Sequence, residues 1–398
     1  MQLPPLRLKK DQERRLLTGH CWVYSNEIDI EATPLRAFEG GDVAELFGHG
    51  GHWIGYAYVN PHSLIAARLV SRRRGRPPTP ALWVERIARA LELRQRLYPK
   101  PFYRLIFGEA DGLPGLTVDR YGSSLVAQLT TAGMERAKAD LIAALEQVVR
   151  PETVLLRNDA PVRAMEGLGE YVETVVGSVP ETAEVEENGA RFRVSLTGGQ
   201  KTGWFFDQAE NRSRLGRYGV RGRVLDLFSY VGAWGIQAAL GGAEDVLCVD
   251  ASAAALERVT QNAALNGVGD RVRTSQGDAF TVLKQLADTG ERFDTVILDP
   301  PAFIKRRKDV AEGSQAYQRL NRMGIGLLTE GGLLVTSSCS FHMERDVFLR
   351  TVQRASRRSG FSLQLLEVGG QGPDHPIHPA IAETAYLKTL FLRATPAF

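Results

Sequence analysis

The chain has 398 residues, of which 43% are hydrophobic and 24% charged, values typical of globular proteins that argue against disorder and collagen-like repeats. This length predicts two or three domains. No apolar run reaches the ~18 residues of a spanning helix, and charges follow the first five residues, so neither a membrane span nor a secretory signal is expected. Three cysteines without a CxxC pattern (Cys21, Cys248 and Cys339) favour a reducing, cytoplasmic compartment over disulfides or zinc.

The net charge of +3 is unevenly distributed. The first 100 residues carry 16 Lys and Arg against 10 Asp and Glu, a balance of +6, whereas the remainder has a balance of −3. Clustered arginines in the basic part, Arg72, Arg73 and Arg74 with Arg76, suit a polyanion. A solvated linker between domains is the alternative interpretation of the same cluster.

Short apolar runs and turn signals predict a small all-β domain over residues 1–74, with strands at 42–47, 53–59 and 64–70. The segment 75–80 (GRPPTP) reads as a linker. A central α+β domain is then predicted over 75–196. Its expected elements are helices at 81–97 and 134–149, strands at 102–107, 125–129 and 154–157, and a hairpin of strands 184–187 and 191–196 around Asn188-Gly189.

From residue 197 to 398, β-like runs alternate with helix-like stretches, which predicts a parallel sheet with helices on both faces. Ligands of such sheets bind beyond the carboxyl ends of the strands. The expected strands are 223–228, 245–249, 272–275, 295–298 and 333–337, the helices are 234–240, 253–266 and 279–286, and a terminal strand pair covers 361–368 and 385–393. His375 and His378 lie in a proline-rich loop without further ligands, so no metal site is predicted.

A glycine-containing turn follows the first strand of this third domain. The segment 224–235 (VLDLFSYVGAWG) resembles motif I of class I S-adenosylmethionine (SAM)-dependent methyltransferases. Gly232 lets the backbone approach a ligand, and Asp226 offers an acceptor to the ammonium group of the cofactor. Asp250, ending the next strand, suits both ribose hydroxyls, and Asp278, after the third strand, suits the adenine edge. The NAD fingerprint is absent, and an unrelated sheet with acidic strand ends is the alternative.

The segment 293–303 (FDTVILDPPAF) resembles motif IV of base-modifying methyltransferases. Two prolines hold the backbone after Asp299 extended, so that its carboxyl group can face a planar base. Phe303 could stack on such a base.

Cys339 ends the strand at 333–337 and is expected to lie beside the Asp299 loop. As a nucleophile it would add to C6 of a cytosine, so that C5 can take a methyl group. Asp299 would hydrogen-bond N3 and favour the addition, and a base would remove H5. A small packed residue is the alternative for Cys339, as expected for Cys248 and Cys21.

Basic residues follow motif IV. Residues 301–325 carry six Lys and Arg against two acids, a balance of +4 that suits a phosphate backbone. An exposed, charged helix start is the alternative. A target base inside helical RNA would have to flip out, which favours loops and unpaired sites.

Over nearly its whole length the chain resembles bacterial 23S ribosomal RNA cytosine-C5 methyltransferases of the RlmI type. Residues 8–27 resemble the start of that family's RNA-binding PUA domain, and 109–116 (EADGLPGL) match its small central domain. Residues 200–212 resemble its cofactor-contacting "KTGxxxDQRxNR" element, with Ala209 where the family usually has Arg.

This resemblance implies an N-terminal all-β PUA-like barrel, a small central α+β domain and a C-terminal α/β class I methyltransferase domain with a Rossmann-like, seven-stranded sheet. It implies SAM as cofactor, S-adenosylhomocysteine as product and large-subunit ribosomal RNA as substrate, with no membrane partner; a homodimer is left open. The catalytic residues are expected to be Cys339 and Asp299. The expected cofactor-binding residues are Lys201, Gly203, Phe205, Asp207, Gln208, Asn211, Asp226, Phe228, Ser229, Tyr230, Gly232, Asp250, Ala251, Ser252, Asp278, Ala279 and Asp299. The expected RNA-binding residues are Arg72, Arg73, Arg74, Phe303, Lys305, Arg306, Arg307 and Lys308.

Three other functions remain open at this point. A related sheet could methylate another RNA position, such as guanine N7, without a covalent thiol. The chain could be an RNA-binding assembly factor without catalysis, although the intact acidic strand ends argue against that. A small-molecule methyltransferase would leave the basic N-terminal domain unexplained.

Overall fold

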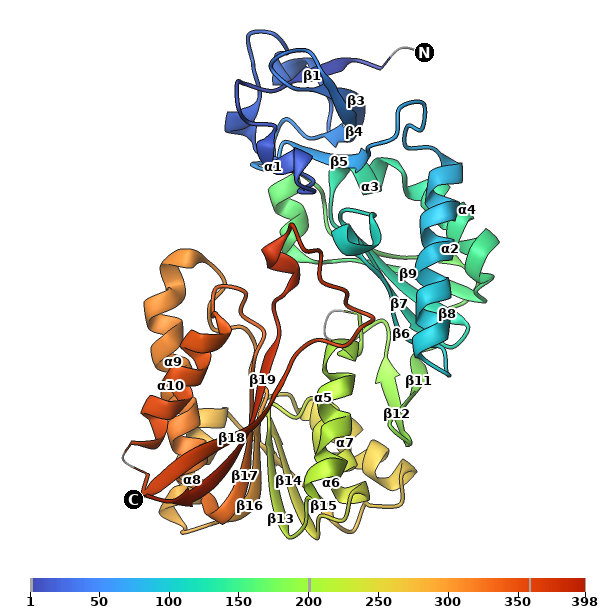
Figure 1. Cartoon of the computed structure of the whole chain (residues 1–398). Coiled ribbons are helices and arrows are strands. Elements are labelled where there is room, and N and C mark those ends of the chain that lie inside the picture. The colour runs from blue at the N-terminus through green and yellow to red at the C-terminus, as the bar shows by residue number, and fades with distance from the viewer. Residues whose placement is uncertain (1–2, 200–201, 358, 398) are drawn as a thin grey trace. The chain divides into compact units, whose positions relative to one another are not determined.

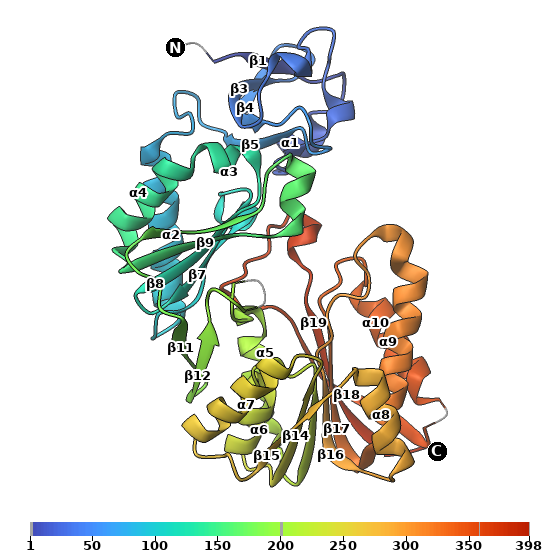
Figure 2. The same ribbon diagram turned by 180° about the vertical axis from the view of Figure 1, so that it is seen from behind.

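A computed structural model of the chain describes residues 3–199, 202–357 and 359–397. The chain divides into two compact units (Figures 1 and 2). The first unit contains Met1–Ala183, Ser195–Trp204 and Pro373–Thr384, and the second contains Glu184–Val194, Phe205–Gly372 and Ala385–Phe398.

The first unit begins with a five-stranded sheet in the order β1-β3-β4-β5-β2. Its elements are β1 (Pro5–Arg7), α1 (Arg14–Leu17), β2 (Trp22–Val23), η1 (Ser25–Glu27), η2 (Leu35–Ala37), β3 (Asp42–Phe47), β4 (Trp53–Val59) and β5 (Ala67–Ser71). The strands predicted at 42–47 and 53–59 are confirmed. The strand predicted at 64–70 begins only at Ala67, because the Asn60 amide donates to the Ala66 carbonyl and closes a turn that leaves Leu64 exposed.

A second sheet of the first unit has the order β10-β9-β8-β7-β6, with β8 and β9 parallel and the other pairs antiparallel. Helices α2 and α4 pack against each other beside this sheet (Figure 1). The elements are α2 (Pro80–Leu97), β6 (Phe102–Phe107), η3 (Gly108–Asp111), β7 (Leu116–Tyr121), β8 (Ser124–Leu129), α3 (Ala132–Arg136), α4 (Lys138–Val149), β9 (Thr153–Asn158), η4 (Pro161–Glu166) and β10 (Tyr171–Val176), and η8 (Ala382–Thr384) also belongs to this unit.

The single helix predicted over 134–149 is wrong, because the backbone breaks at Ala137, whose ψ angle is 6°. The two parts pack on different partners. In α3, Gly133 lies against the Tyr58 ring so closely that a Cβ there would be 2.1 Å from it. Helix α4 instead packs along α2. The segment therefore forms two helices that pack on different elements.

The hairpin predicted around Asn188-Gly189 is confirmed as β11 (Thr182–Glu187) and β12 (Ala190–Ser195). Asn188 and Gly189 have φ angles of 52° and 81°, the left-handed conformation that two-residue hairpin turns require.

The second unit is built on a seven-stranded sheet in the order β15-β14-β13-β16-β17-β19-β18, in which β19 is antiparallel to both of its neighbours. Helices α6 and α7 cover one face and α8, α9 and α10 the other (Figures 1 and 2). The elements are η5 (Phe206–Gln208), α5 (Ala209–Ser213), η6 (Arg214–Tyr218), β13 (Arg223–Leu227), α6 (Ala233–Leu240), β14 (Asp245–Asp250), α7 (Ala253–Leu265), β15 (Val272–Gln276), α8 (Ala279–Asp288), β16 (Phe293–Leu298), η7 (Arg307–Asp309), α9 (Val310–Ile325), β17 (Leu328–Ser338), α10 (Arg345–Ser356), β18 (Phe361–Gly369) and β19 (Lys388–Pro396).

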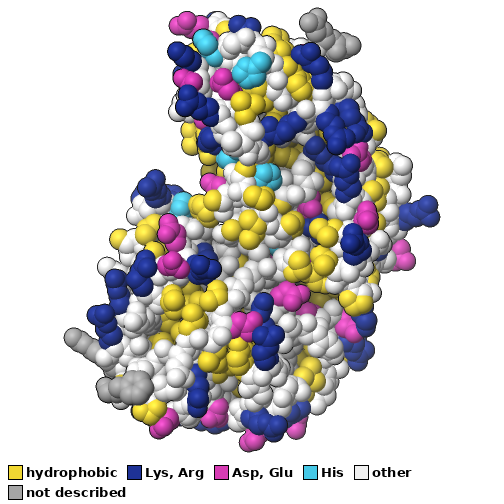
Figure 3. Space-filling model, in the orientation of Figure 1, with side chains coloured by type: hydrophobic (Ala, Val, Ile, Leu, Met, Phe, Trp, Pro, Cys, Tyr) yellow, Lys and Arg dark blue, Asp and Glu magenta, His cyan; other side chains and the backbone are white. Residues whose placement is uncertain are grey.

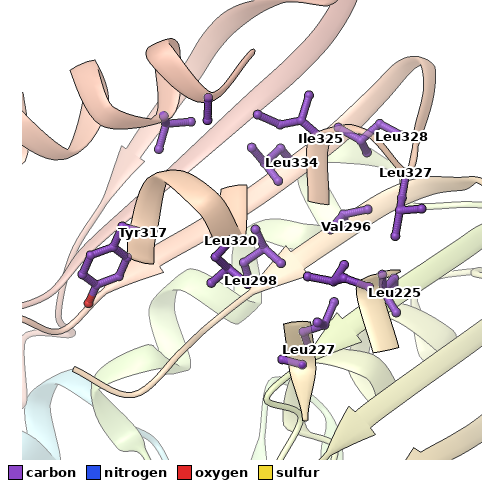
Figure 4. Packing of buried hydrophobic residues seen from close by; sticks show 14 of the residues in the cluster. Leu225, Leu227, Val296, Leu298, Tyr317, Leu320, Ile325, Leu327, Leu328 and Leu334 are labelled. Atoms are coloured by element: carbon purple, nitrogen blue, oxygen red, sulfur yellow. The ribbon is translucent and has the colours of Figure 1, made fainter. Parts of the chain in front are cut away.

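The core of this sheet is apolar on the α8–α9–α10 side (Figure 4). Leu225 and Leu227 of β13, Val296 and Leu298 of β16, and Leu320 of α9 are all fully buried there. Burying such side chains contributes about 1.5–3 kcal/mol each. Within the part of the chain that the structure describes, no helix combines the length and apolar character that crossing a membrane would take.

Strand β13 and helix α6 approach each other closely through Gly235. A Cβ at Gly235 would lie 2.5 Å from the Cys248 sulfur of β14 and 3.2 Å from Asp226 Oδ2 of β13, so only a glycine allows α6 to pack this closely on the sheet. The Gly235 amide donates to Asp226 Oδ2 at 2.9 Å. Asp226 is fully buried, and this burial raises the pKa of its carboxyl group to about 8.

Asp226→Asn should therefore become more stable relative to the parent as the pH rises. A carboxyl group whose folded-state pKa is raised stabilises the fold fully below its unfolded pKa of about 3.9, and that contribution is lost as the pH rises through 8. Urea unfolding between pH 5 and 8 should show the difference in free energy of unfolding changing by up to about 1.4 kcal/mol per pH unit. A pH-independent difference between the two proteins would contradict this.

Candidate active site at the carboxyl edge of the sheet

Four predicted aspartates lie at or just beyond the carboxyl ends of neighbouring strands. Asp226 lies within β13, Asp250 ends β14, Asp278 follows β15, and Asp299 follows β16. Because these strands are parallel and adjacent, the four side chains come to one edge of the sheet. The sequence prediction of an acidic edge is thus matched by the topology.

The loop between β13 and α6 has an unusual backbone. Phe228 and Tyr230 have positive φ angles of 62° and 50°, and Gly232 one of 88°. Non-glycine residues adopt this conformation rarely, and it clusters at ligand sites. Asp250 holds the loop in place, because Oδ2 accepts the Tyr230 amide and Oδ1 accepts the Ser252 amide, both at 2.9 Å.

Two buried polar atoms at this loop have no hydrogen-bond partner among the residues that the structure describes, namely Asp226 Oδ1 and the Ser229 hydroxyl. Leaving such atoms unpaired costs about 1–3 kcal/mol each. A polar ligand could satisfy them. The loop therefore fits the cofactor that its sequence predicts.

Three residues of the predicted cofactor site, after β14 and β15, are exposed, unlike the buried Asp226 and Ser229. Ala251 and Ser252 are exposed, and Ser252 caps α7 by accepting the Ala255 amide. Asp278 is exposed and caps α8 by accepting the Thr281 amide at 3.1 Å, whereas Ala279 is buried in the core.

Elements η5 and α5 carry residues 206–212 of the predicted "KTGxxxDQRxNR" element. The Phe205 ring meets the Tyr230 ring edge-on, with centroids 5.6 Å apart. Asp207 accepts the Tyr386 hydroxyl at 2.6 Å, and Asn211 donates to Gln208 Oε1 at 2.6 Å. Gly203 belongs to the first unit, and Lys201 lies outside the described residues.

Both carboxylate oxygens of Asp299 are fixed by donors from distant parts of the chain. Gln208 Nε2 donates to Oδ1 at 2.8 Å, and the Trp234 indole donates to Oδ2 at 3.0 Å. Because Asn211 occupies the Gln208 carbonyl oxygen, the amide nitrogen of Gln208 faces Asp299. Burial raises the pKa of Asp299 to about 6, although the two donors act in the opposite direction.

Cys339 follows β17, which is the neighbour of β16 in the sheet. Its Sγ lies 3.9 Å from the carbonyl oxygen of Pro300, the residue after Asp299. Cys339 is half-buried, whereas Cys21 and Cys248 are buried. Burial raises the pKa of Cys21 to about 12 and that of Cys248 well above its usual value, so neither is suited to act as a nucleophile.

The predicted RNA-binding residues after motif IV differ in their surroundings. Lys305, Arg306, Arg307 and Lys308 are exposed, with Arg306 paired to Asp309 at 3.1 Å. The half-buried Phe303 ring packs on Tyr317, with centroids 4.8 Å apart.

In the first unit, Arg72, Arg73 and Arg74 are exposed at the start of the connection between β5 and α2, where Figure 3 shows Lys and Arg side chains gathered. Arg72 and Arg73 line a concave surface together with Arg76, Arg86 and Arg89. Arg74 lies over the Trp53 ring instead.

Two side chains of the site escaped the sequence analysis. Trp234 was read only as part of motif I, and Lys388, at the start of β19, belongs to no motif. The regular strand pattern around Lys388 gave no sign that its side chain is buried. No group of three His, Cys, Asp or Glu side chains that could hold a metal ion occurs in the described ranges, and His375 bonds Asp374.

Comparisons with known proteins identify the families to which the two ends of the chain are similar. Residues 166–393 match the S-adenosylmethionine-dependent methyltransferase family, and residues 6–72 match the PUA-like domain family. The chain is 36% identical over 394 residues to "Ribosomal RNA large subunit methyltransferase I" of Tolumonas auensis, covering 97% of this chain and 98% of the relative.

Solved structures share the fold. A Streptococcus mutans protein described as a SAM-dependent methyltransferase aligns with a TM-score of 0.82 and 21% identity over 98% of this chain and all of that one. A methyltransferase structure described as complexed with SAH, SMU.776, aligns with a TM-score of 0.84 and 22% identity over 98% of this chain and 100% of its own. The predicted fold class is thereby confirmed.

The cofactor is therefore SAM, as predicted. With family matches to both its ends and 36% identity to a relative across nearly all of its length, the chain belongs to the ribosomal RNA large subunit methyltransferase I family.

Proposed function

We propose that this protein methylates C5 of a cytosine in large-subunit (23S) ribosomal RNA through a transient bond between Cys339 and C6 of the base. The RNA class is that named for its relatives. The observation that carries the base chemistry is the Cys339 sulfur 3.9 Å from the carbonyl oxygen of Pro300, the residue that follows Asp299, whose carboxyl group is fixed by two donors.

In this proposal the β13–α6 loop and its neighbours hold SAM. Asp226 and Ser229 offer unsatisfied buried atoms, and Asp250 can accept the ribose hydroxyls. When bound, SAM supplies the methyl group that C5 takes.

Cys339 supplies the activation that cytosine needs, because C5 alone is a poor nucleophile. The thiolate adds to C6, forming the C6–S bond and an enamine with electron density at C5. After C5 has gained the methyl group, H5 leaves to a base and the C6–S bond breaks. The thiolate and the aromatic ring are thereby restored.

Asp299 stabilises the addition by sharing a proton with N3 of the base. Its raised pKa of about 6 keeps a proton on the carboxyl group at a higher pH than an exposed aspartate could. Gln208 and Trp234 hold the group in one orientation, so little reorganisation is needed during the reaction.

RNA binding is assigned to the exposed cations after motif IV and to the arginines of the first unit. Lys305, Arg307 and Lys308 are exposed next to the Asp299 loop. Arg72 and Arg73 line the concave surface of the first unit.

The three predicted domains, 1–74, 75–196 and 197–398, and the open possibility of a homodimer remain predictions.

Cys339→Ala should abolish methylation, because the other two described cysteines, Cys21 and Cys248, are buried and cannot replace it. Incubation with labelled SAM and large-subunit ribosomal RNA, followed by nucleoside mass spectrometry, should give 5-methylcytidine with the parent and none with the variant. Cys21→Ala is the matched control and should retain activity, and both variants should bind SAM in calorimetry. Label in a guanosine product, or 5-methylcytidine formed by Cys339→Ala at the parent rate, would refute the mechanism.

Asp299→Asn should slow methylation by about 10²–10⁴-fold, the usual contribution of a positioned proton donor. The amide also turns its NH2 group toward one of the two donors, Gln208 or Trp234, so that one of these hydrogen bonds is lost. Single-turnover rates at saturating SAM and RNA measure the effect, with the exposed Asp288→Asn as control. A rate within tenfold of the parent would remove Asp299 from the chemistry.

A triple alanine variant at Lys305, Arg307 and Lys308 should bind RNA less tightly than the parent. Its affinity should also depend less steeply on the salt concentration. Each lost phosphate contact should reduce the slope of log K against log salt by about 0.7–0.9. Fluorescence titrations at several salt concentrations test this. The control removes three exposed cations elsewhere on the same unit, Arg221, Lys284 and Arg292, and an equal reduction in the control would contradict the assignment.

A further inference from the structure

Lys388 is a buried lysine beside the predicted nucleophile. Only 7% of it is exposed, and it is the first residue of β19. In the register of β17 and β19, Lys388 pairs with Ser338, the residue before Cys339. Because β19 is antiparallel to β17, the start of β19 lies at the same sheet edge as Cys339 and Asp299.

The amino group of Lys388 is hydrogen-bonded to Ser340, the residue that follows Cys339. Nζ donates to the Ser340 carbonyl at 2.6 Å and to the Tyr386 carbonyl at 2.8 Å. These two uncharged acceptors leave one N–H of an ammonium group. The Ser340 segment is itself fixed, because the Ser340 hydroxyl accepts the Ile304 amide and bonds the Tyr317 hydroxyl.

Lys388 lacks a carboxylate partner within residues 3–199, 202–357 and 359–397. Lysines are almost never this buried unless they are paired. Cys339, at the end of β17, precedes Ser340, whose carbonyl accepts from Lys388 and whose hydroxyl bonds that of Tyr317 in α9. Tyr386, whose carbonyl also accepts from Lys388, donates its hydroxyl to Asp207 of η5. Of these, Cys339 is the group whose charge acts on Lys388.

Burial lowers the pKa of Lys388 to about 8, and a negative charge at Cys339 raises it again. The coupling is mutual: a thiolate favours the ammonium, and the ammonium favours the thiolate. A neutral thiol would leave the buried ammonium without a counterion.

We propose that the ammonium group of Lys388 is the counterion of the Cys339 thiolate and makes the nucleophile available near neutral pH. This inference rests on the proposed function of Cys339. The thiol proton leaves to water, the S–H electron pair stays on sulfur, and Lys388 keeps its own proton. Lys388 is thus a positioning residue that acts through Cys339, without contacting the base.

The test is the pH dependence of Cys339 alkylation by iodoacetamide on the full chain, followed by peptide mass spectrometry between pH 6 and 10. Lys388→Gln removes the charge but keeps a donor for a carbonyl. In this variant the pH at which Cys339 alkylation reaches half of its maximal rate should rise by about one unit. Alkylation at pH 7.5 should then be about tenfold slower than in the parent. Lys388→Arg should restore much of the parent profile, and the exposed Lys284→Gln should leave it unchanged.

An unchanged midpoint in a folded Lys388→Gln protein that binds SAM would overturn the pairing and leave Lys388 as a bridge between two carbonyls. If that variant does not fold, the parent alone decides, because an alkylation midpoint at or above the ~8.5 of a free thiol would also overturn the pairing. Since alkylation needs no RNA, this readout is independent of methylation. A shifted midpoint together with full methylation by Cys339→Ala would support the ion pair while refuting the proposed function.

Discussion

The site depends on the fixed orientation of one carboxyl group, that of Asp299. Its two oxygens accept from Gln208 and Trp234, which lie 91 and 65 positions earlier in the chain. Gln208 is in turn oriented by Asn211, which also donates to the Gly370 carbonyl. Elements η5, α5 and α6, which carry these side chains, must therefore be in place before Asp299 has a single orientation. The fold itself thus provides the preorganisation that catalysis requires.

The same edge concentrates ionisable groups that are unfavourable to bury. Burial raises the pKa of Asp226 to about 8 and that of Asp299 to about 6, and lowers that of Lys388 to about 8. Each shift favours the neutral form at the expense of folding stability. Strongly shifted groups gathered at one sheet edge are typical of functional sites rather than of cores. The apolar cluster beneath the sheet offsets this loss.

Local patterns in the sequence predicted much of the fold. Strands β3, β4 and β6 match their predicted bounds, and the Asn188-Gly189 turn and the alternating elements after residue 222 were recognisable because each follows from local periodicity. Features set by tertiary packing were missed. The break at Ala137 reflects two packing partners, and the burial of Lys388 follows from its register with Ser338 across the sheet. The hydrogen bond from the Trp234 indole to Asp299 joins residues 65 positions apart, so no local pattern predicts it.

The most direct test of the account is mass spectrometry of the complex formed with SAM and ribosomal RNA that contains 5-fluorocytosine. Fluorine at C5 cannot leave as H5 does, so a covalent intermediate would be trapped. The account predicts a methylated base attached to the peptide that contains Cys339. A bond to any other residue, or complete recovery of uncoupled protein under conditions in which ordinary RNA is methylated, would contradict it.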